Sequence, residues 1–253
     1  MSSLARDWDA ATYERVSTPQ VRWALDVLDR LPLRGDETVL DAGCGSGRVT
    51  RLLEQRLPEG RVIAVDASPS MIEKARQVLR PDATLLVCEL TELDLEQAAD
   101  AAFSNAVFHW IPDHEALFAR LHAALRPDGR LVAQCGGEGN ITAFHELLSE
   151  VAAEAPFAGY IGGWAGPWNF ATPADTRARL EAAGFTEVDC WLEPRSVRPE
   201  EPEEFMRTVC LGHHLERLPE ALRPELVRRM ADRAGSPLML DYVRLNIDAR
   251  RPG

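Results

Sequence analysis

The amino-acid sequence predicts an α/β fold built on a doubly wound, mostly parallel sheet. Hydrophobic residues shift repeatedly between the two-residue period of strands and the 3.6-residue period of amphipathic helices. A glycine-rich joint separates the first strand from the following helix, and an acidic residue ends the second strand. With 253 residues, 45% of them hydrophobic, the chain can form one domain with a cap. We therefore expect a single domain over 1–253, with its core at about 35–140.

The first half of the chain contains the strands and helices of this core. In the opening helix the apolar residues share one face, and a later helix begins with Ser68 as N-cap and Pro69 at its first position. The sequence Arg-Pro-Asp-Gly at 126–129 ends the last helix of this half. The predicted elements are helix 20–31, strand 37–43, helix 47–57, strand 61–67, helix 68–79, strand 84–90, strand 99–109, helix 113–125 and strand 130–137.

After residue 140 the strand–helix alternation is less regular. The glycine-rich and aromatic segment 155–171 is predicted to be a substrate lid, because it is too aromatic for an idle surface loop and too rich in glycine for a core. A packing flap or a dimer patch is the alternative for this segment. The other predicted elements are helix 142–154, helix 173–183, strand 186–194, a helical insertion of two helices at about 199–235, and a last strand over 242–250 that pairs as a hairpin partner.

Composition excludes several classes of function. The net charge of −12 and the absence of a basic stretch argue against a nucleic-acid partner. The five cysteines are odd in number and have no CxxC spacing, which argues against a disulfide framework and a metal site. No apolar run is long enough for a membrane span, and the first residues lack a signal-peptide core. We expect a cytoplasmic protein that is a monomer or a weak homodimer.

The strongest motif is the loop 39–47, with sequence VLDAGCGSG, where the first strand meets its helix. Glycines there let the backbone approach a ligand at the start of a helix. A dinucleotide site needs a third glycine at the position of Arg48, and Asp41 stands where a pyrophosphate would lie. A P-loop is excluded because no Gly-Lys-Ser/Thr follows. A ligand with an ammonium group and no phosphate suits this loop better, and a nicotinamide dehydrogenase is the disfavoured alternative.

Two further acids extend this ligand site. Asp66 ends the second strand and can accept hydrogen bonds from two ribose hydroxyls. Glu89 follows the third strand and can accept from an exocyclic adenine amine, with the Leu90 amide near a ring nitrogen. The three strand ends together indicate groups for an aminoacyl tail, a ribose and an adenine.

These motifs resemble those of the class I S-adenosylmethionine-dependent methyltransferases, through VLDAGCGSG, VIAVDASPSMIEKAR and LRPDGRLV between about 35 and 135. Within that superfamily the chain is most similar to the trans-aconitate and juvenile hormone acid methyltransferases, through WDAATY at 8–13, SNAVFHWIPD at 104–113, TPADTRARLEAAGF at 172–185 and YVRLNI at 242–247. The resemblance implies a Rossmann-like, seven-stranded sheet with its last strand antiparallel, a helical cap, and S-adenosylmethionine as the cofactor. The cofactor-binding residues that we expect are Tyr13, Asp41, Ala42, Gly43, Cys44, Gly45, Asp66, Ala67, Met71, Glu89, Leu90, Ser104 and Asn105.

The acceptor is expected to be a small molecule, and a carboxylic acid is the favoured class. His109 and Trp110 follow the fourth strand, where the transferable methyl group should point, although both residues can also simply pack there. By resemblance, Gln20 matches a glutamine that holds the acid. A carboxylate needs alignment but no base, so we expect loss of Gln20 or Trp110 to lower turnover more than loss of His109, and the reverse order for a phenol or an amine.

Further residues are candidates for substrate binding. Trp164 and Trp168 in the lid segment are expected to contact the substrate, and Arg207 is the favoured carboxylate-binding arginine. Arg195, Arg198 and Arg244 are further candidates, but each has acidic neighbours, and most of these arginines are expected in solvated ion pairs. The two histidines at 213–214 are expected to be structural. A cofactor-binding protein that performs no methylation, and a methyltransferase acting on nitrogen, carbon or a phenol, are the alternatives.

Overall fold

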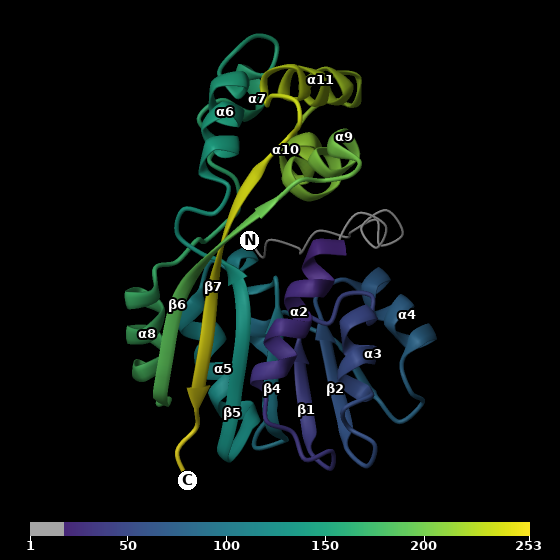
Figure 1. Ribbon diagram of the computed structural model, residues 1–253, viewed down its shortest axis with the longest axis vertical. Helices are drawn as coiled ribbons and strands as arrows, with labels where there is room; N and C mark the ends of the chain where they lie inside the picture. The colour runs from purple at the N-terminus through teal and green to yellow at the C-terminus, as the bar shows by residue number, and fades with distance from the viewer. Residues whose placement is uncertain (1–17) are drawn as a thin grey trace.

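The computed structural model describes the backbone of residues 18–253 and the side chains of residues 22–253. Its centre is a seven-stranded sheet of order β3-β2-β1-β4-β5-β7-β6, in which β7 runs antiparallel to both of its neighbours and the other paired strands are parallel. This confirms the predicted sheet with its antiparallel last strand (Figure 1). The strands are β1 (Thr38–Ala42), β2 (Arg61–Asp66), β3 (Thr84–Val87), β4 (Ala99–Asn105), β5 (Leu125–Gly136), β6 (Thr186–Val197) and β7 (Leu240–Arg250).

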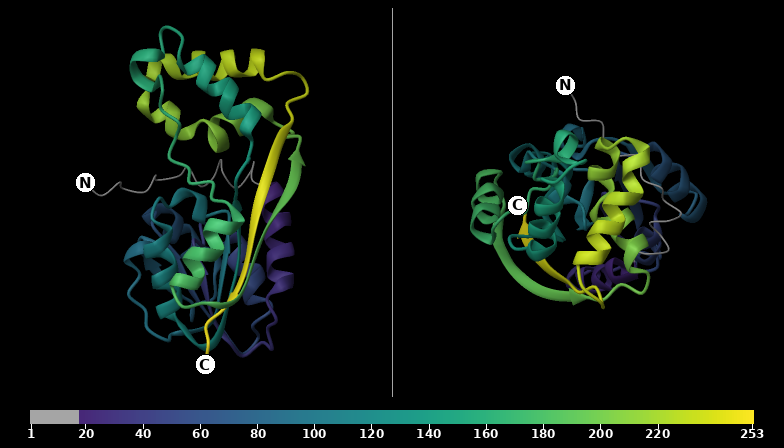
Figure 2. Two further views of the ribbon diagram at one scale, coloured as in Figure 1. Left: turned by 90° about the vertical axis from the view of Figure 1, so that its left-hand side faces the viewer. Right: turned by 90° about the horizontal axis from the view of Figure 1, so that it is seen from above.

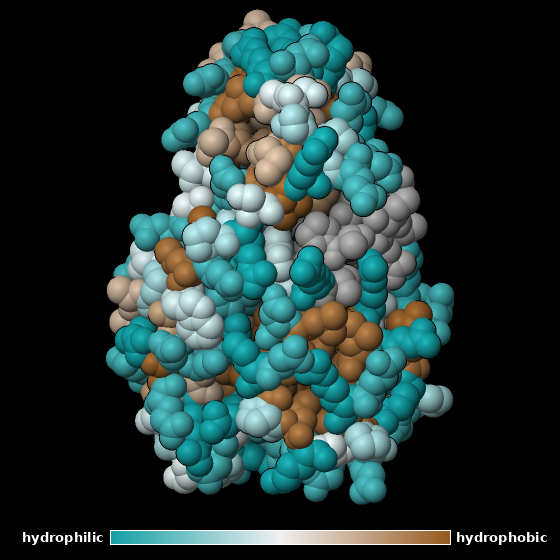
Figure 3. Space-filling model, viewed as in Figure 1, coloured by the Kyte–Doolittle hydropathy of each residue, from teal (hydrophilic) through white to brown (hydrophobic). Residues whose placement is uncertain are grey.

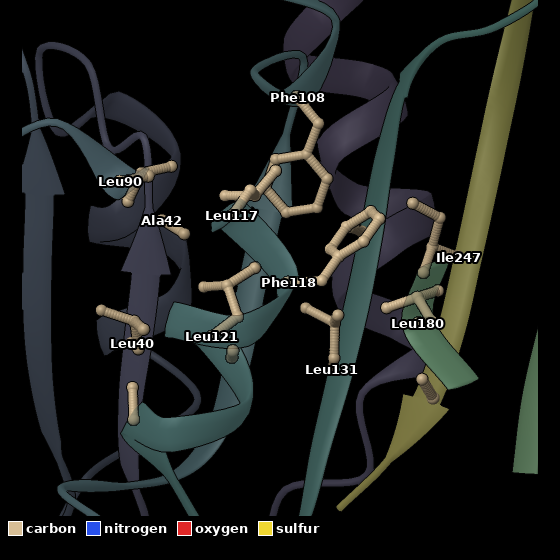
Figure 4. Packing of buried hydrophobic residues seen from close by; sticks show 14 of the residues in the cluster. Leu40, Ala42, Leu90, Phe108, Leu117, Phe118, Leu121, Leu131, Leu180 and Ile247 are labelled. Carbon is tan, nitrogen blue, oxygen red and sulfur yellow. The ribbon is translucent and has the colours of Figure 1, made fainter. Parts of the chain in front are cut away.

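Helices cover both faces of the sheet, as expected for a doubly wound fold. One face packs against α2 (Thr18–Arg30), α3 (Arg48–Glu54) and α4 (Pro69–Val78). The other face packs against α5 (His114–Ala124) and α8 (Pro173–Ala182). Figure 4 shows Leu117, Phe118 and Leu121 of α5 lying between that helix and the strands. Both faces of β1, β2 and β4 are therefore largely buried, which is why these strands read as apolar runs in the sequence.

Local capping residues fix where the helices begin. The Ser68 side chain accepts a hydrogen bond from the Met71 amide at 3.3 Å, and Pro69 follows it, as the sequence predicted. Thr172 caps α8 in the same way, accepting from the Asp175 amide at 3.0 Å. The fourth strand ends at 105 rather than 109 because the chain turns at Ala106, whose φ is 62°.

A helical cap lies above the carboxyl ends of the strands, and β6 and β7 extend from the sheet into it (Figures 1 and 2). The cap has its own apolar core, to which Trp23 of α2 and Tyr242 of β7 contribute. The insertion at 199–235 is divided more finely than the two helices expected. Pro219 separates α10 from the 3₁₀ turn that follows, and Pro224 lies in the first turn of α11. The cap consists of α6 (Thr142–Ala152), α7 (Ala158–Ile161), α9 (Pro202–Phe205), a π-helix (Met206–Cys210), α10 (Gly212–Arg217), a 3₁₀ turn (Glu220–Leu222) and α11 (Arg223–Arg233).

The surface mixes hydrophilic and hydrophobic residues. In the view of Figure 3 hydrophobic areas are scattered among hydrophilic ones. The large hydrophobic side chains that are exposed come from separate elements: Leu25, Val78, Val87, Tyr160 and Met239. Within residues 18–253, no helix has the length and apolar character needed to cross a membrane.

Candidate active site

The predicted cofactor residues meet at one edge of the sheet. The strand order places β1 between β2 and β4, so their carboxyl ends lie side by side at the point where the order reverses. Open α/β sheets bind ligands at this topological switch point. The loop 43–47 follows β1, Asp66 ends β2, Glu89 follows β3, and Asn105 ends β4.

The glycine loop does not present its amides to a phosphate group. The φ angles of Gly43, Gly45 and Gly47 are 91°, 54° and 83°, all in the left-handed region that favours glycine. The amides of Gly43 and Cys44 donate to the Val65 carbonyl at 2.8 and 2.9 Å, and the Gly47 amide donates to the Cys44 carbonyl at 3.1 Å. Since these donors are used within the protein, the loop suits a ligand without a pyrophosphate, as its sequence indicated.

Asp66 connects this loop to the next helix. Its carboxylate accepts hydrogen bonds from the amides of Gly45 and Ser68, each at 2.9 Å. Burial raises the pKa of Asp66, although both of these amides oppose the shift. A carboxylate has about four acceptor positions, so it can still accept from ribose hydroxyls. Among the described residues, a Cβ atom on Gly45 would meet no atom within 4 Å, and the acceptor oxygens of Asp66 fit the two hydroxyl donors of a ribose diol.

Asp41 lies deeper than its sequence position suggested. The residue is 1% exposed, and its carboxylate accepts a hydrogen bond from the Thr50 hydroxyl at 2.7 Å. Burial raises the pKa of Asp41 to about 7, and the charge of Asp66 adds to the shift. A cation bound nearby would favour the ionised form. A direct contact between Asp41 and the cofactor stays a prediction.

The other predicted cofactor residues frame the same edge. Ser104 is buried, and its hydroxyl donates to the Ala42 carbonyl at 2.6 Å, which ties the end of β4 to that of β1. Tyr13 lies outside the described residues. Of the rest, Met71 and Leu90 are buried, whereas Ala67, Glu89 and Asn105 are half-buried.

His109 lies at the mouth of the site, in a 3₁₀ turn (Phe108–Trp110) after β4. The Gly136 amide at the end of β5 donates a hydrogen bond to His109 Nδ1 at 3.2 Å. Burial lowers the pKa of His109 well below its usual value, and the Arg244 charge adds to this effect. A neutral imidazole that accepts at Nδ1 carries its proton on Nε2. His109 is therefore a hydrogen-bond donor at Nε2 and has no lone pair there with which to take a proton.

An aromatic junction joins this mouth to the cap. The Trp110 ring lies 4.9 Å from His109 and 6.1 Å from Trp168. The predicted lid residues Trp164 and Trp168 both contact the His214 ring, at 4.5 and 5.7 Å. The structure thus brings the lid segment against the predicted catalytic residues. The rings of the junction are those of His109, Trp110, His145, Trp164, Trp168, Phe170, His213 and His214.

The arginines that were candidates for carboxylate binding lie in different environments. Arg207 is exposed, with its Nε 3.9 Å from a Glu204 oxygen, so its predicted role in binding a carboxylate stays a prediction. Arg195 forms the expected ion pairs, with Asp26 at 3.0 Å and Glu193 at 2.7 Å.

Arg244 does not lie in a solvated ion pair, which is the environment that the sequence suggested for most of these arginines. It is 2% exposed, its Nε donates to Gln134 Oε1 at 3.3 Å, and its guanidinium lies 4.8 Å from the Trp23 ring centroid. Its acidic neighbours in sequence do not determine its environment, because β7 turns this side chain toward α2. The strand pairing that buries Arg244 cannot be predicted from its neighbours in the sequence.

The sequence assigned no ligand-binding role to two histidines of the junction. His145, on α6, was not considered, and His214 was expected to be only structural. The signal in the sequence that could have pointed to His145 is its position directly after Phe144, which lies on the apolar face of α6. Among the residues from 18 onward, no group of three or more histidine, cysteine or acidic side chains is placed to hold a metal ion. The side chain of Gln20 lies outside the described residues, although its backbone belongs to the first turn of α2.

Comparisons with known proteins agree with this geometry. The family model described as "Methyltransferase domain" matches residues 39–129. A trans-aconitate 2-methyltransferase of Methylobacterium nodulans is 37% identical over 186 residues, covering 74% of this chain and 67% of the relative. That of Variovorax paradoxus is also 37% identical, covering 73% of this chain and 71% of the relative.

A solved structure shows the same fold with the cofactor present. Phosphoethanolamine N-methyltransferase 2 of Haemonchus contortus, in complex with S-adenosyl-L-methionine, superposes with a TM-score of 0.64 at 19% identity. The match covers 99% of this chain and 58% of that one. Together with the acids at three neighbouring strand ends and a glycine loop whose amides are used internally, these similarities show that the chain belongs to the class I S-adenosylmethionine-dependent methyltransferases.

Proposed function

We propose that this enzyme transfers a methyl group to a carboxylate oxygen of a small organic acid. The observation that carries the proposal is the hydrogen bond from the Gly136 amide to His109 Nδ1. It leaves the neutral imidazole with a donor, Nε2–H, directed away from that amide. A carboxylate is ionised at neutral pH and needs donors that fix its orientation, whereas a phenol or an amine acceptor often needs a base. His109 as placed suits the first kind of acceptor.

The chemistry required of the protein is mainly alignment. S-adenosylmethionine supplies a methyl group that its sulfonium already activates. Holding an acceptor in line at near-attack distance can contribute about 7–11 kcal/mol to lowering the barrier. His109 and the Trp110 indole N–H are the proposed donors that orient the acid, with Gln20 as a third by resemblance. The names of the two relatives support the same acceptor class, because trans-aconitate is a carboxylic acid.

The test of this proposal is transfer of a labelled methyl group to a panel of acids, phenols and amines. We expect labelled ester from an acid of the trans-aconitate type. Transfer only to phenols or amines would contradict the proposal. Absence of transfer to any acceptor, with S-adenosylmethionine bound, would instead favour a role for the bound cofactor other than methylation.

The donor role of His109 predicts a specific order of variants. We expect His109→Ala to lower kcat/KM on the acid by roughly 10- to 100-fold, since hydrogen bonds to charged groups contribute about 1.5–3 kcal/mol. His109→Gln should retain most of the activity, because an amide N–H can replace Nε2–H. His122→Gln, on α5, is the matched control and should behave like the parent.

The pH dependence provides a second check of the same role. Because burial lowers the pKa of His109, the neutral donor form persists as the pH falls below 6.5. The rate on an acid should therefore not fall between pH 8 and pH 6 through protonation of His109. The pH profiles of the parent and of His109→Gln should have the same shape over this range. Equal loss of activity in His109→Ala and His109→Gln would indicate a base and contradict the donor role.

A further inference from the structure

Arg244 is a buried cation beside the mouth of the site. It lies on β7 directly opposite Gly136 of β5, and it is 2% exposed. The Gly136 amide is the donor to His109 Nδ1 at 3.2 Å. Taking a charge out of water costs several kcal/mol, so a guanidinium held at this position calls for a reason other than stability.

The Arg244 guanidinium is tied to the segment that carries His109. Its Nε donates to Gln134 Oε1 at 3.3 Å, and the Gln134 carbonyl accepts from the Ala106 amide at 2.7 Å. Ala106 has a φ of 62° and begins the turn that leads from β4 to His109. Gln134 therefore links Arg244 to the start of this turn, and the Gly136 amide holds the imidazole at its end.

The same guanidinium contacts α2. Its Cζ lies 4.8 Å from the Trp23 ring centroid, within the range of a cation–π interaction. The Trp23 ring also packs edge-on against Tyr242 of β7, with the centroids 5.2 Å apart. Gln20 precedes Trp23 by three positions, which is about one helical turn. Arg244 therefore contacts the end of α2 to which the proposed glutamine donor belongs.

A chain of buried amides continues this contact along α2. Gln134 Nε2 donates to Asn246 Oδ1 at 2.8 Å, and Arg30 Nη1 donates to the same oxygen at 2.5 Å. Gln134 and Asn246 are 1% and 0% exposed. Because Trp23 and Arg30 are seven positions apart, about two helical turns, the helix is held on the sheet at two points. Buried polar networks of this kind rigidify the elements that they join.

The charge of Arg244 acts on His109 in the same direction as burial. Burial is the largest cause of the lowered pKa of His109, and the Arg244 charge adds to it, followed by that of His114. The neutral imidazole is the form that accepts from the Gly136 amide at Nδ1 and donates at Nε2. Arg244 thus favours the donor form of His109 by its charge as well as by its contacts.

We propose that Arg244 is a positioning residue for methyl transfer, which holds the His109 turn and the first turn of α2 in one arrangement. Donors on both elements align the acceptor, so loss of Arg244 lets them move relative to each other. A misplacement of about 1 Å can cost roughly 100-fold in rate. The inference rests on the proposed function, because it takes His109 and Gln20 as the groups that orient the acceptor.

Steady-state kinetics test this role. Arg244→Met keeps the length of the side chain but removes its charge and its donors, whereas Arg244→Lys keeps the charge and a donor. We expect Arg244→Met to lower kcat at least tenfold. The KM for the acid and the dissociation constant of S-adenosylhomocysteine should stay within about threefold of the parent, because the lost interaction acts on alignment in the transition state. Arg244→Lys should recover part of the loss in kcat.

Arg80→Met is the matched control. Arg80 also supports the backbone from inside the fold, since its Nη1 and Nη2 donate to the carbonyls of Leu57 and Gly60 at 2.9 and 2.6 Å. Both carbonyls precede β2 and so lie at the edge of the sheet opposite the site. Arg80→Met should lower the melting temperature and keep the parental kcat.

A spectroscopic measurement follows the His109 ring itself. In the complex with S-adenosylhomocysteine at neutral pH, the ¹⁵N chemical shifts of the imidazole, assigned with His109→Gln, report which nitrogen carries the proton. We expect the Nε2–H tautomer alone in the parent and in Arg80→Met. Arg244→Met should show a mixture of the two tautomers, because the Gly136 amide no longer holds Nδ1.

Trp23→Leu keeps the inference testable if Arg244→Met does not fold. This variant removes the contact of Arg244 with α2 but leaves the charge and the bond to Gln134 in place. We expect kcat to fall at least threefold while His109 keeps its parental tautomer. A parental kcat in Trp23→Leu would overturn the inference.

The combined outcomes are distinct. Parental kcat and a parental His109 tautomer in Arg244→Met would overturn the positioning role, as would a fall in kcat that is matched by equally weaker binding of S-adenosylhomocysteine. Methylation of acids in either case leaves the proposed function intact. Transfer only to phenols or amines contradicts the proposed function, and the His109 tautomer in Arg244→Met then decides whether Arg244 positions this residue.

Discussion

Asp66→Asn is expected to weaken binding of S-adenosylhomocysteine by at least tenfold. The carboxylate is the predicted acceptor for the ribose hydroxyls, and loss of a charge-assisted hydrogen bond costs about 1.5–3 kcal/mol. The same carboxylate accepts from the amides of Gly45 and Ser68, and an asparagine would turn a donor toward one of them. The variant thus loses both the ligand contact and part of the support of the glycine loop.

The measurement is a calorimetric titration of each variant with S-adenosylhomocysteine, together with its thermal unfolding. Asp100→Asn is the matched control, because the Asp100 carboxylate accepts from the Thr38 amide at 2.8 Å, near the amino end of β4. The control should lose stability but bind the ligand like the parent. If Asp66→Asn bound with parental affinity, Asp66 would only support the loop, and its assignment to the ribose would be wrong.

Gly43→Ala is expected to be the most damaging single substitution in the glycine loop. A Cβ on Gly43 would lie 2.2 Å from Val107 Cγ2, and the φ of 91° is one that alanine rarely adopts. Backbone strain of this kind costs about 1–3 kcal/mol, and overpacking typically adds about 1–3 kcal/mol. We expect a fall in melting temperature of about 5 °C or more, and weaker cofactor binding, because the loop must move.

Two further variants test whether the loss of stability in Gly43→Ala comes from the contact with Val107. Gly159→Ala introduces a Cβ that meets no atom of residues 18–253 within 4 Å and should leave the melting temperature almost unchanged. The double variant Gly43→Ala/Val107→Ala should recover part of the stability lost in Gly43→Ala. It removes the contacts at 2.2 and 2.7 Å with the two Cγ atoms of Val107, but not the contact at 2.9 Å with its Cβ or the backbone strain. A Gly43→Ala protein as stable as the parent would show that the loop can adapt, and would contradict the close fit between Gly43 and Val107.

The cofactor half of the site was readable from the sequence because its determinants are local. The order of strands and helices follows from hydrophobic periods, and the Ser68 cap is set by residues three positions apart. The acids at the ends of β2 and β3 could be placed at one edge of the sheet, because parallel strands have their carboxyl ends together. The fold class followed from these local patterns, and the antiparallel last strand and the cofactor followed from the family resemblance that the same motifs carry; all three were predicted correctly.

The acceptor half was decided by the tertiary structure, because its contacts join segments far apart in the chain. The state of His109 depends on the Gly136 amide, 27 positions away, and the position of Arg244 on Gln134, 110 positions away. Likewise, His145 and His214 meet only because both α6 and α10 pack around Trp168. Periodicity shows which face of an element is buried, but not which buried faces meet. The sequence thus determined the fold class and the cofactor of this protein, and the packing of the cap on the sheet decided which side chains meet at the proposed acceptor site.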